Sequence, residues 1–290
     1  MIVYLNGEFT PIEQARISVL DRGFIFGDGA YESIPVYSRR PFRLNEHLSR
    51  LERSLNAIQL RNPHSEAEWA RIIAALIERH ADEDQSLYLH ITRGAAMRDQ
   101  AFPNPPPAPT VFVMSAPLTT PPSEQIENGI ACITAPDNRW LRCDIKVISL
   151  LPNVLLRQMS VDAGCAETIL IRDDSFMTEG AACNIFVVKN GTLLAPPKDH
   201  LILPGVTYDV VLELAAANGI PCQVRRISKQ EVFAADELLL TSSTKEILAI
   251  TQLDGKPVGN GKPGAMFARL YPLYQQFKRE VMRREDSAEC

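Results

Sequence analysis

Residues 143–151 read Cys-Asp-Ile-Lys-Val-Ile-Ser-Leu-Leu and place one lysine, Lys146, among apolar neighbours. Fourteen arginines and no lysine precede it, so arginine carries the ordinary positive charge of this part of the chain. Burial of an amine disfavours its charged form and lowers its pKa, as a Schiff-base lysine requires. Taken alone, however, the segment fits a strand lysine that reaches solvent better than a catalytic one.

Beyond this lysine, residues 178–184 read Thr-Glu-Gly-Ala-Ala-Cys-Asn and place one acid, Glu179, before small residues and a strand. The small residues would let a flat ring approach the backbone. A carboxylate that faces a pyridine nitrogen keeps the nitrogen protonated and the ring an electron sink. A solvated turn glutamate is the alternative interpretation.

Residues 203–207, Leu-Pro-Gly-Val-Thr, lie where a loop enters a helix that we expect to begin near Thr207. Backbone N–H groups and the helix dipole at such a point can receive a phosphate. Hydroxyls of Thr207 and of Ser242 and Ser243, at the end of a strand expected over 237–240, could add donors. An ordinary N-cap and an ordinary turn are the alternatives.

The first half of the chain alternates predicted strands and helices. A capping box at residues 65–68 predicts a helix from Glu66 to about His80. Short β-branched and aromatic runs predict strands over 87–92 and 110–114, separated by a proline-rich loop over 102–109.

The second half begins after a stretch with three prolines within residues 117–122. We therefore expect an N-terminal α/β domain over 1–117, a linker over 118–122 and a C-terminal cofactor-binding domain over 123–290. The elements expected beyond the linker are strands over 168–171, 184–189 and 192–195, a type I′ hairpin at Asn190-Gly191, and a helical segment from Ala265 onward.

Composition narrows the possible partners and locations. A formal net charge of -5 gives no basic surplus for binding nucleic acid, and no apolar run approaches a membrane-spanning length. The first residues lack the features of a secretory signal, so we expect a cytoplasmic protein. Six scattered cysteines without a C-x-x-C pair predict reduced thiols and no metal site.

Several of these segments belong to a set that stands in a fixed order along nearly the whole chain. The set comprises residues 21–32 (Asp-Arg-Gly-Phe-Ile-Phe-Gly-Asp-Gly-Ala-Tyr-Glu), 46–51 (Glu-His-Leu-Ser-Arg-Leu), 92–94 (Thr-Arg-Gly), Lys146, 178–180, 203–207 and 237–243. Together these motifs resemble the fold type IV pyridoxal-phosphate family. The resemblance implies an α/β (α+β type) chain of two domains, with pyridoxal 5′-phosphate between them, in a homodimer whose partner supplies part of the active-site entrance.

Carried over position by position, the resemblance implies that Lys146 is the catalytic residue, which carries the cofactor as a Schiff base and acts as general base. It implies that Glu179 pairs with the pyridine nitrogen and that Arg50 binds the cofactor phosphate. The other implied cofactor contacts are Leu203, packed behind the ring, and the phosphate donors Val206, Thr207, Ser242 and Ser243.

Residues 138–146, Asn-Arg-Trp-Leu-Arg-Cys-Asp-Ile-Lys, are most similar to the D-amino acid aminotransferase branch of this family. In that branch a tyrosine and an arginine trap the substrate carboxylate, a task that suits the planar fork of arginine. Gln100 stands in place of a histidine of that branch, and Pro35 and Tyr208 replace basic residues, changes expected to reshape the pocket entrance. The matching substrate-binding residues are Tyr31, Tyr88, Arg98 and Gln100.

The expected reaction is ping-pong transamination between a D-alanine-like amino acid and a 2-oxo acid such as 2-oxoglutarate. The alternatives are an aminodeoxychorismate lyase, an L-branched-chain or (R)-amine aminotransferase, and a cofactor-free homologue that serves as a binding module. Residues 149–151 (Ser-Leu-Leu) disfavour the lyase, and the element around Arg98 disfavours the other two aminotransferases. Joint retention of Lys146, Glu179 and Arg50 disfavours the cofactor-free homologue.

Overall fold

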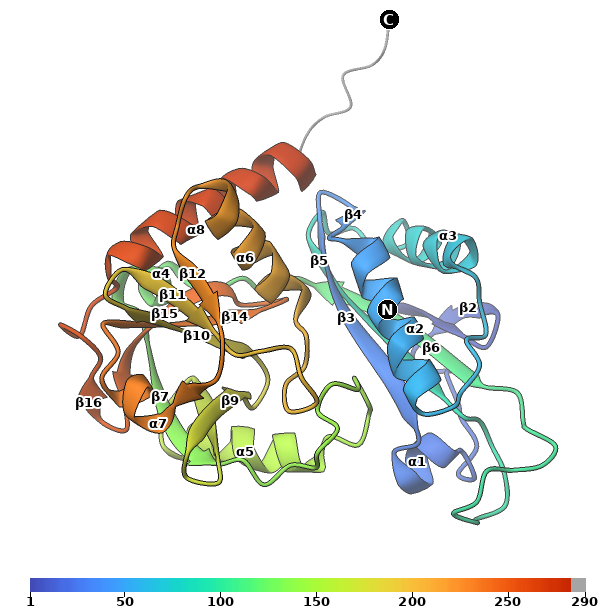
Figure 1. The fold of residues 1–290 in the computed structure, drawn as a ribbon. Helices are drawn as coiled ribbons and strands as arrows, with labels where there is room; N and C mark the ends of the chain where they lie inside the picture. The colour runs from blue at the N-terminus through green and yellow to red at the C-terminus, as the bar shows by residue number, and fades with distance from the viewer. Residues whose placement is uncertain (283–290) are drawn as a thin grey trace, which may run out of the picture. The chain divides into compact units, whose positions relative to one another are not determined.

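The computed structural model describes residues 1–282; residues 283–290, which include Cys290, lie outside the described part. The chain forms two compact units (Figure 1). The first comprises residues 1–119 and 145–150, and the second comprises 120–144 and the described residues from 151 onward. The lysine-bearing segment 145–150 thus belongs to the first unit, whereas the sequence-based boundaries place it in the C-terminal domain.

The first unit is built on one antiparallel sheet, whose strand order within residues 1–282 is β2-β1-β6-β5-β3-β4. Its elements are β1 (Ile2–Leu5), β2 (Glu8–Pro11), α1 (Arg22–Phe26), β3 (Gly29–Tyr37), β4 (Arg40–Pro41), α2 (Leu44–Ala57), α3 (Glu66–Ile77), β5 (Gln85–Thr92) and β6 (Thr110–Pro117). The predicted helix from Glu66 and both predicted strands are confirmed, and Ser65 and Glu68 form the expected capping box.

Helices α2 and α3 cover one face of this sheet and form a single core with it (Figure 1). Burial alternates along β5, as expected for a strand with one face on a core. Leu48, Leu51 and Leu55 recur at helical spacing along α2 and are buried against the sheet, as Trp69 is from α3. This packing fixes α2 relative to β3, which is the framework for the residues around Lys146.

The second unit contains a larger, mixed sheet of order β12-β11-β10-β14-β15-β7-β8-β9-β13, with β16 paired to β15. Its elements are α4 (Ser123–Asn128), β7 (Ile130–Pro136), α5 (Leu151–Asp162), β8 (Glu167–Arg172), β9 (Phe176–Gly180), β10 (Asn184–Lys189), β11 (Thr192–Ala195), α6 (Val206–Ala217), β12 (Cys222–Val224), β13 (Ile227–Ser228), α7 (Lys229–Phe233), β14 (Glu237–Ser242), β15 (Glu246–Leu253), β16 (Lys256–Pro257), α8 (Ala265–Phe277) and the π-helix η1 (Lys278–Met282). The predicted α/β (α+β type) class is confirmed.

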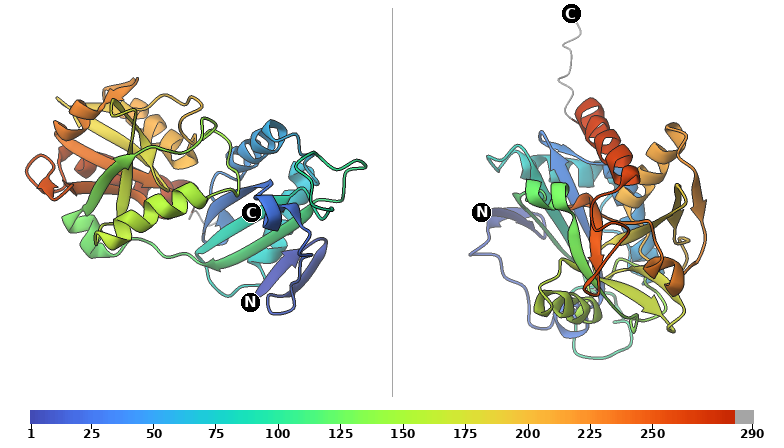
Figure 2. Two further views of the ribbon diagram at one scale, coloured as in Figure 1. Left: turned by 90° about the horizontal axis from the view of Figure 1, so that it is seen from below. Right: turned by 90° about the vertical axis from the view of Figure 1, so that its left-hand side faces the viewer.

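Local predictions in this unit are also confirmed. β10 and β11 have the predicted bounds and are joined by Asn190 and Gly191, whose φ angles of 49° and 72° fit a type I′ turn. The helix expected near Thr207 begins at Val206 and packs beside α8, as Figure 2 shows.

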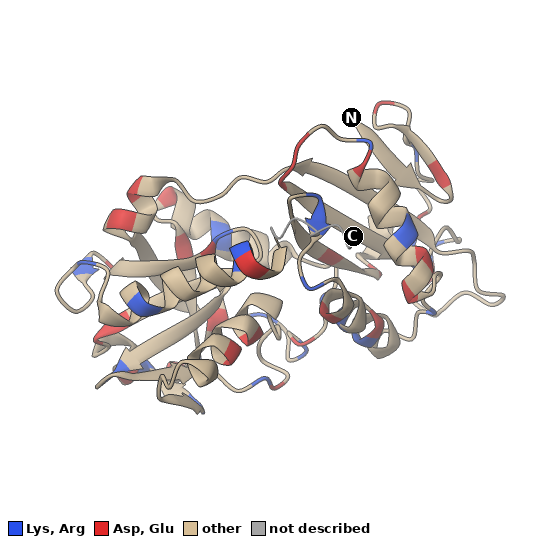
Figure 3. Cartoon of the chain, turned by 90° about the horizontal axis from the view of Figure 1, so that it is seen from above, with Lys and Arg blue, Asp and Glu red and all other residues tan. Residues whose placement is uncertain are grey.

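The described helices of both units carry charged residues (Figure 3) and are not suited to span a membrane. No helix within residues 1–282 combines the length and hydropathy needed to cross a bilayer. Acidic and basic residues are mixed along the helices of both units (Figure 3).

Candidate active site

Lys146 lies in an irregular segment that is held to β3 and α2 of the first unit. Its backbone N–H donates to Ser54 Oγ at 3.1 Å, and its carbonyl accepts from the Tyr31 N–H at 3.0 Å. The residue is 9% exposed, and its Nζ lies 4.2 Å from the centroid of the Tyr31 ring. The interpretation as a strand lysine that reaches solvent is therefore wrong, because the amine lies buried over an aromatic face.

Arg50 is buried on α2 beside the carboxylate of Glu32 on β3. Its Nε and Nη2 each donate to a Glu32 oxygen at 2.8 Å, and His47 Nδ1 lies 2.8 Å from the same carboxylate. Burial opposes ionisation of Glu32, but Arg50 and His47 together hold its pKa well below the ordinary value. Burial lowers the pKa of His47. Glu32 therefore fixes the orientation of the Arg50 guanidinium.

Two of the predicted substrate-binding residues, Tyr31 and Tyr88, lie together on adjacent strands β3 and β5. Their ring centroids are 5.6 Å apart, and the Tyr88 hydroxyl lies 2.8 Å from His90 Nδ1. Burial, with a smaller contribution from Tyr31, raises the pKa of Tyr88 to about 12. The structure thus brings Lys146, Tyr31 and Tyr88 into one cluster, in which the Tyr88 hydroxyl is hydrogen-bonded to His90.

The other two predicted substrate-binding residues, Arg98 and Gln100, are exposed on the loop between β5 and β6. The Arg98 guanidinium lies 5.5 Å from the centroid of the Phe26 ring. Within residues 1–282, no hydrogen bond, ion pair or ring contact joins Arg98 or Gln100 to Tyr31 or Tyr88. Arg98 and Gln100 thus make no such direct contact with the two tyrosines in the described part of the chain, and their role as substrate-binding residues stays a prediction.

The base of this loop is held by Arg22, a residue to which the sequence analysis gave no role. Arg22 is 3% exposed, and its Nη1 donates to the carbonyls of Asp99 at 2.5 Å and Ala101 at 3.2 Å. Asp28 accepts from Nε of both Arg22 and Arg93 at 2.8 Å. The Asp-Arg-Gly motif at residues 21–23 was the only sequence feature that pointed to Arg22. It could not reveal the contact with the loop carbonyls, because these lie far from Arg22 in sequence.

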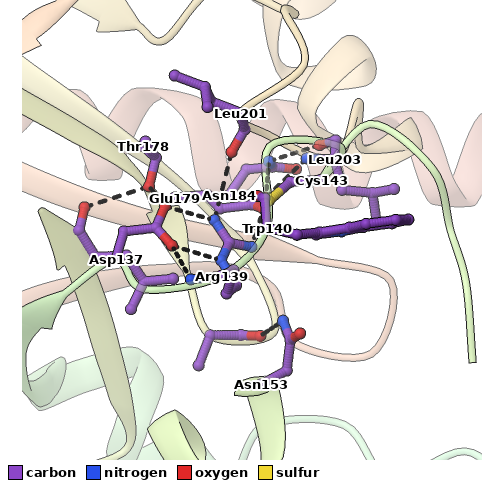
Figure 4. A network of polar contacts seen from close by, with 12 residues as sticks. Asp137, Arg139, Trp140, Cys143, Asn153, Thr178, Glu179, Asn184, Leu201 and Leu203 are labelled. Atoms are coloured by element: carbon purple, nitrogen blue, oxygen red, sulfur yellow. Dashed lines mark hydrogen bonds and ion pairs between the residues drawn. The ribbon is translucent and has the colours of Figure 1, made fainter. Parts of the chain in front are cut away.

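Glu179 lies in β9 of the second unit at the centre of a polar network (Figure 4). It is 5% exposed, so the interpretation as a solvated turn glutamate is wrong. Its Oε1 accepts from Arg139 Nη1 at 2.5 Å, and its Oε2 accepts from the Leu203 N–H at 3.1 Å and Asn184 Nδ2 at 3.2 Å. Burial raises the pKa of Glu179 to about 7, and the Arg139 guanidinium counteracts that rise.

Asn184 connects Glu179 to the start of α6. Its Nδ2 also donates to the Leu203 carbonyl at 2.9 Å, and its Cα is paired with that of Thr241 on β14. A Cβ added at Gly205 would lie 2.1 Å from Asn184 Oδ1, so this position requires glycine for close approach. In the sequence Asn184 is only the end of the motif around Glu179, and no local pattern there predicts this role.

The predicted phosphate donors gather where α6 begins and β14 ends. Val206 and Thr207 are the first residues of α6, whose N-cap glycine makes no side-chain hydrogen bond to them. Ser242 closes β14, and Ser243 follows in the adjoining turn. Thr241 Oγ1 is buried and has no hydrogen-bond partner within residues 1–282. N–H groups without a side-chain cap and a buried hydroxyl without a partner fit a bound phosphate.

Two residues expected to reshape the pocket entrance are interior residues of their own units. Pro35 is buried in β3. Tyr208 is 1% exposed, stacks on Phe186 at 4.9 Å and donates its hydroxyl to the Pro196 carbonyl at 2.7 Å. Any effect they have on the entrance must act through packing.

Comparison with known proteins gives one consistent result. The family model described as Amino-transferase class IV matches residues 29–253. The D-alanine aminotransferase of Bacillus licheniformis is 38% identical over 266 residues, which cover 92% of this chain and 93% of that protein. The D-alanine aminotransferase of Staphylococcus epidermidis is 35% identical over 275 residues, or 95% of this chain and 97% of that protein.

Solved structures agree with this result. The Escherichia coli branched-chain amino acid aminotransferase has a TM-score of 0.85 and 26% identity, covering 99% of this chain and 97% of that one. A fold IV transaminase from Curtobacterium pusillum has a TM-score of 0.78 and 26% identity, covering 92% of this chain and 93% of that one. The chain therefore belongs to the class IV aminotransferases.

Proposed function

We propose that this protein is a pyridoxal 5′-phosphate-dependent aminotransferase that exchanges amino groups between a D-alanine-like amino acid and a 2-oxo acid such as 2-oxoglutarate. The observation that carries the proposal is a buried lysine, Lys146, in one unit and a buried carboxylate, Glu179, in the other, in a chain of this family. D-alanine is favoured as donor because the related D-alanine aminotransferases match at 35% and 38% identity over most of both chains.

The residues present fit pyridoxal phosphate. The start of α6 and the buried Thr241 hydroxyl suit an anionic phosphate. We assign phosphate binding to Arg50, Val206, Thr207, Ser242 and Ser243, packing behind the ring to Leu203, and the contact with the ring nitrogen to Glu179.

When bound, the cofactor supplies an electron-accepting ring that stabilises negative charge at the substrate α-carbon. Lys146 would provide the amine that holds the cofactor covalently, and its Nζ, when free of the cofactor, would take and return the proton at the substrate α-carbon as general base. Glu179 keeps a proton at the ring nitrogen. Tyr31 lies under the Lys146 amine and, with Tyr88, forms one wall of the substrate site.

Purified protein reconstituted with pyridoxal phosphate provides the test. We expect its visible absorbance to change with D-alanine, and to return with 2-oxoglutarate, in two separable half-reactions, while Lys146→Ala shows neither change. A response to L-leucine and not to D-alanine would establish the branched-chain alternative, which the likeness to the branched-chain enzyme favours. Pyruvate release from aminodeoxychorismate without an oxo-acid acceptor would establish the lyase.

We further propose that the protein acts as a homodimer and that Arg98 and Gln100 bind substrate carboxylate in an assembled dimer. Supporting this, α5 carries five large apolar side chains that are 45–67% exposed, Leu151, Val154, Leu155, Met159 and Val161, and the first four recur at helical spacing. An exposed apolar stripe of this kind marks an association surface. The five cysteines described within residues 1–282 are free thiols, which supports a cytoplasmic location.

A further inference from the structure

Arg139 occupies a buried position between two carboxylates of the second unit (Figure 4). Its Nε and Nη2 bind the two oxygens of Asp137, each at 2.9 Å, and its Nη1 binds Glu179 Oε1 at 2.5 Å. The residue is 7% exposed. A single arginine therefore uses one edge for Asp137 and presents its remaining terminal nitrogen to Glu179.

Asp137 holds Arg139 in this orientation. It also accepts from Thr178 Oγ1 at 2.7 Å and lies 3.1 Å from Arg172 Nη2. Burial opposes ionisation of Asp137, but Arg139, Thr178 and Arg172 together lower its pKa. The result is a buried chain of alternating charges that runs from Arg172 through Asp137 and Arg139 to Glu179.

The two oxygens of Glu179 have unlike partners. Oε1 contacts the Arg139 cation, whereas Oε2 accepts from the neutral N–H groups of Leu203 and Asn184. Burial alone disfavours a carboxylate here, and Arg139 is the first among the influences that oppose it. Loss of that cation would remove the main influence that lowers the pKa of Glu179, and would therefore reduce the anionic form that can pair with a ring nitrogen.

We propose that Arg139 is a positioning residue that aligns Glu179 and favours its ionised form, so that Glu179 in turn keeps the cofactor ring nitrogen protonated. This inference rests on the proposed cofactor. Arg139 does not need to touch cofactor or substrate to have this effect, because it acts through a carboxylate 2.5 Å away. Lysine at this position would keep the positive charge but could not form the bidentate hydrogen bonds to Asp137.

The test is ¹⁵N NMR of full-length protein reconstituted with ring-¹⁵N-labelled pyridoxal phosphate, recorded from about pH 6 to 9, a range that brackets the raised pKa of Glu179, about 7. We expect a protonated nitrogen near neutral pH in the unaltered protein and loss of that signal in Arg139→Met. Arg139→Lys should restore the protonated signal at least in part. The matched control is Arg142→Met, since Arg142 is an exposed arginine on the same segment, paired with Asp144, and should leave the nitrogen unchanged.

A protonated nitrogen in Arg139→Met over the same pH range as in the unaltered protein would overturn the inference. If Arg139→Met does not fold, Asp137→Asn frees the guanidinium from its anchor, and the inference then requires nitrogen deprotonation at a lower pH in that variant. No change in Asp137→Asn overturns it equally. Failure of the unaltered protein to bind the labelled cofactor would instead refute the proposed function, so the two failures are distinguishable.

Discussion

Replacing Glu32 by glutamine tests whether the buried ion pair with Arg50 stabilises the first unit against unfolding. Glu32 is fully buried, and its two oxygens accept Nε and Nη2 of Arg50 at 2.8 Å each, with His47 at 2.8 Å. Glutamine keeps one acceptor but points an amide NH₂ at donors and leaves the guanidinium without its counter-charge. Removing one partner of a buried pair costs about 3–5 kcal/mol, so we expect a loss of that size in the free energy of unfolding.

The assay is urea unfolding of the cofactor-free protein followed by tryptophan fluorescence. The chain has two tryptophans, and Trp140→Phe leaves only Trp69, which is fully buried in α3. In that background the signal reports the first unit alone. The control is Glu46→Gln on the same helix as Arg50, because Glu46 forms an exposed pair with Arg43 and its loss should cost no more than about 1 kcal/mol.

The lowered pKa of Glu32 also determines how the stability depends on pH. Because the folded pKa of Glu32 is lowered, its stabilisation is present above the unfolded pKa, near 4.5, and is lost as pH falls below it. The difference in the free energy of unfolding between the unaltered protein and Glu32→Gln should therefore be constant from about pH 6 to 8 and should become smaller in acid. The stabilising role of the Glu32–Arg50 pair would be refuted if Glu32→Gln lowered the free energy of unfolding at neutral pH no more than Glu46→Gln does. It would also be refuted if the difference from the unaltered protein grew in acid.

Three further outcomes are expected. Gly205→Ala places a Cβ 2.1 Å from Asn184 Oδ1, so we expect fluorescence titration to show pyridoxal phosphate affinity weakened about tenfold, or ~1.4 kcal/mol; unchanged affinity would contradict the role of this close approach. Asp28→Asn removes the carboxylate shared by Arg22 and Arg93, so hydrogen exchange in residues 98–102 should speed up and KM for D-alanine should rise more than kcat falls; unaltered exchange would count against this brace. Leu155→Glu should convert a dimer to a monomer in sedimentation velocity, and a persistent dimer would show that α5 is not the interface.

The fold was most predictable where local sequence determines local structure. The capping box at Ser65 and the Asn190-Gly191 turn each depend on residues close together in sequence, and both are confirmed. The placement of segment 145–150 was different. It belongs to the first unit because Val147 bridges to Ala30 and Lys146 bonds to Ser54, contacts between residues far apart in sequence that no local pattern encodes.

The candidate site shows the same division. Lys146 and Glu179 were identified through motifs, and the structure shows both to be buried, which their own segments left open. Arg139 stood within a quoted motif but received no role, because its carboxylate partner in the active-site network is 40 positions away in sequence. Arg22 was missed for a similar reason, since the carbonyls it binds lie 77 and 79 positions later.

The two buried networks have a common consequence for how substitutions act. Arg50 is oriented by Glu32 in the first unit, and Glu179 is bound by the Arg139 guanidinium, which we propose favours its ionised form, in the second. In each case the residue proposed to touch cofactor takes its charge state or direction from a neighbour that need not touch it. Because these pairs are buried, solvent and salt screen them little, so the charge of Glu32 acts strongly on Arg50 and the charge of Arg139 acts strongly on Glu179. Loss of Glu32 or Arg139 should therefore weaken the cofactor site about as much as a direct change, although neither position would be chosen from a list of cofactor contacts.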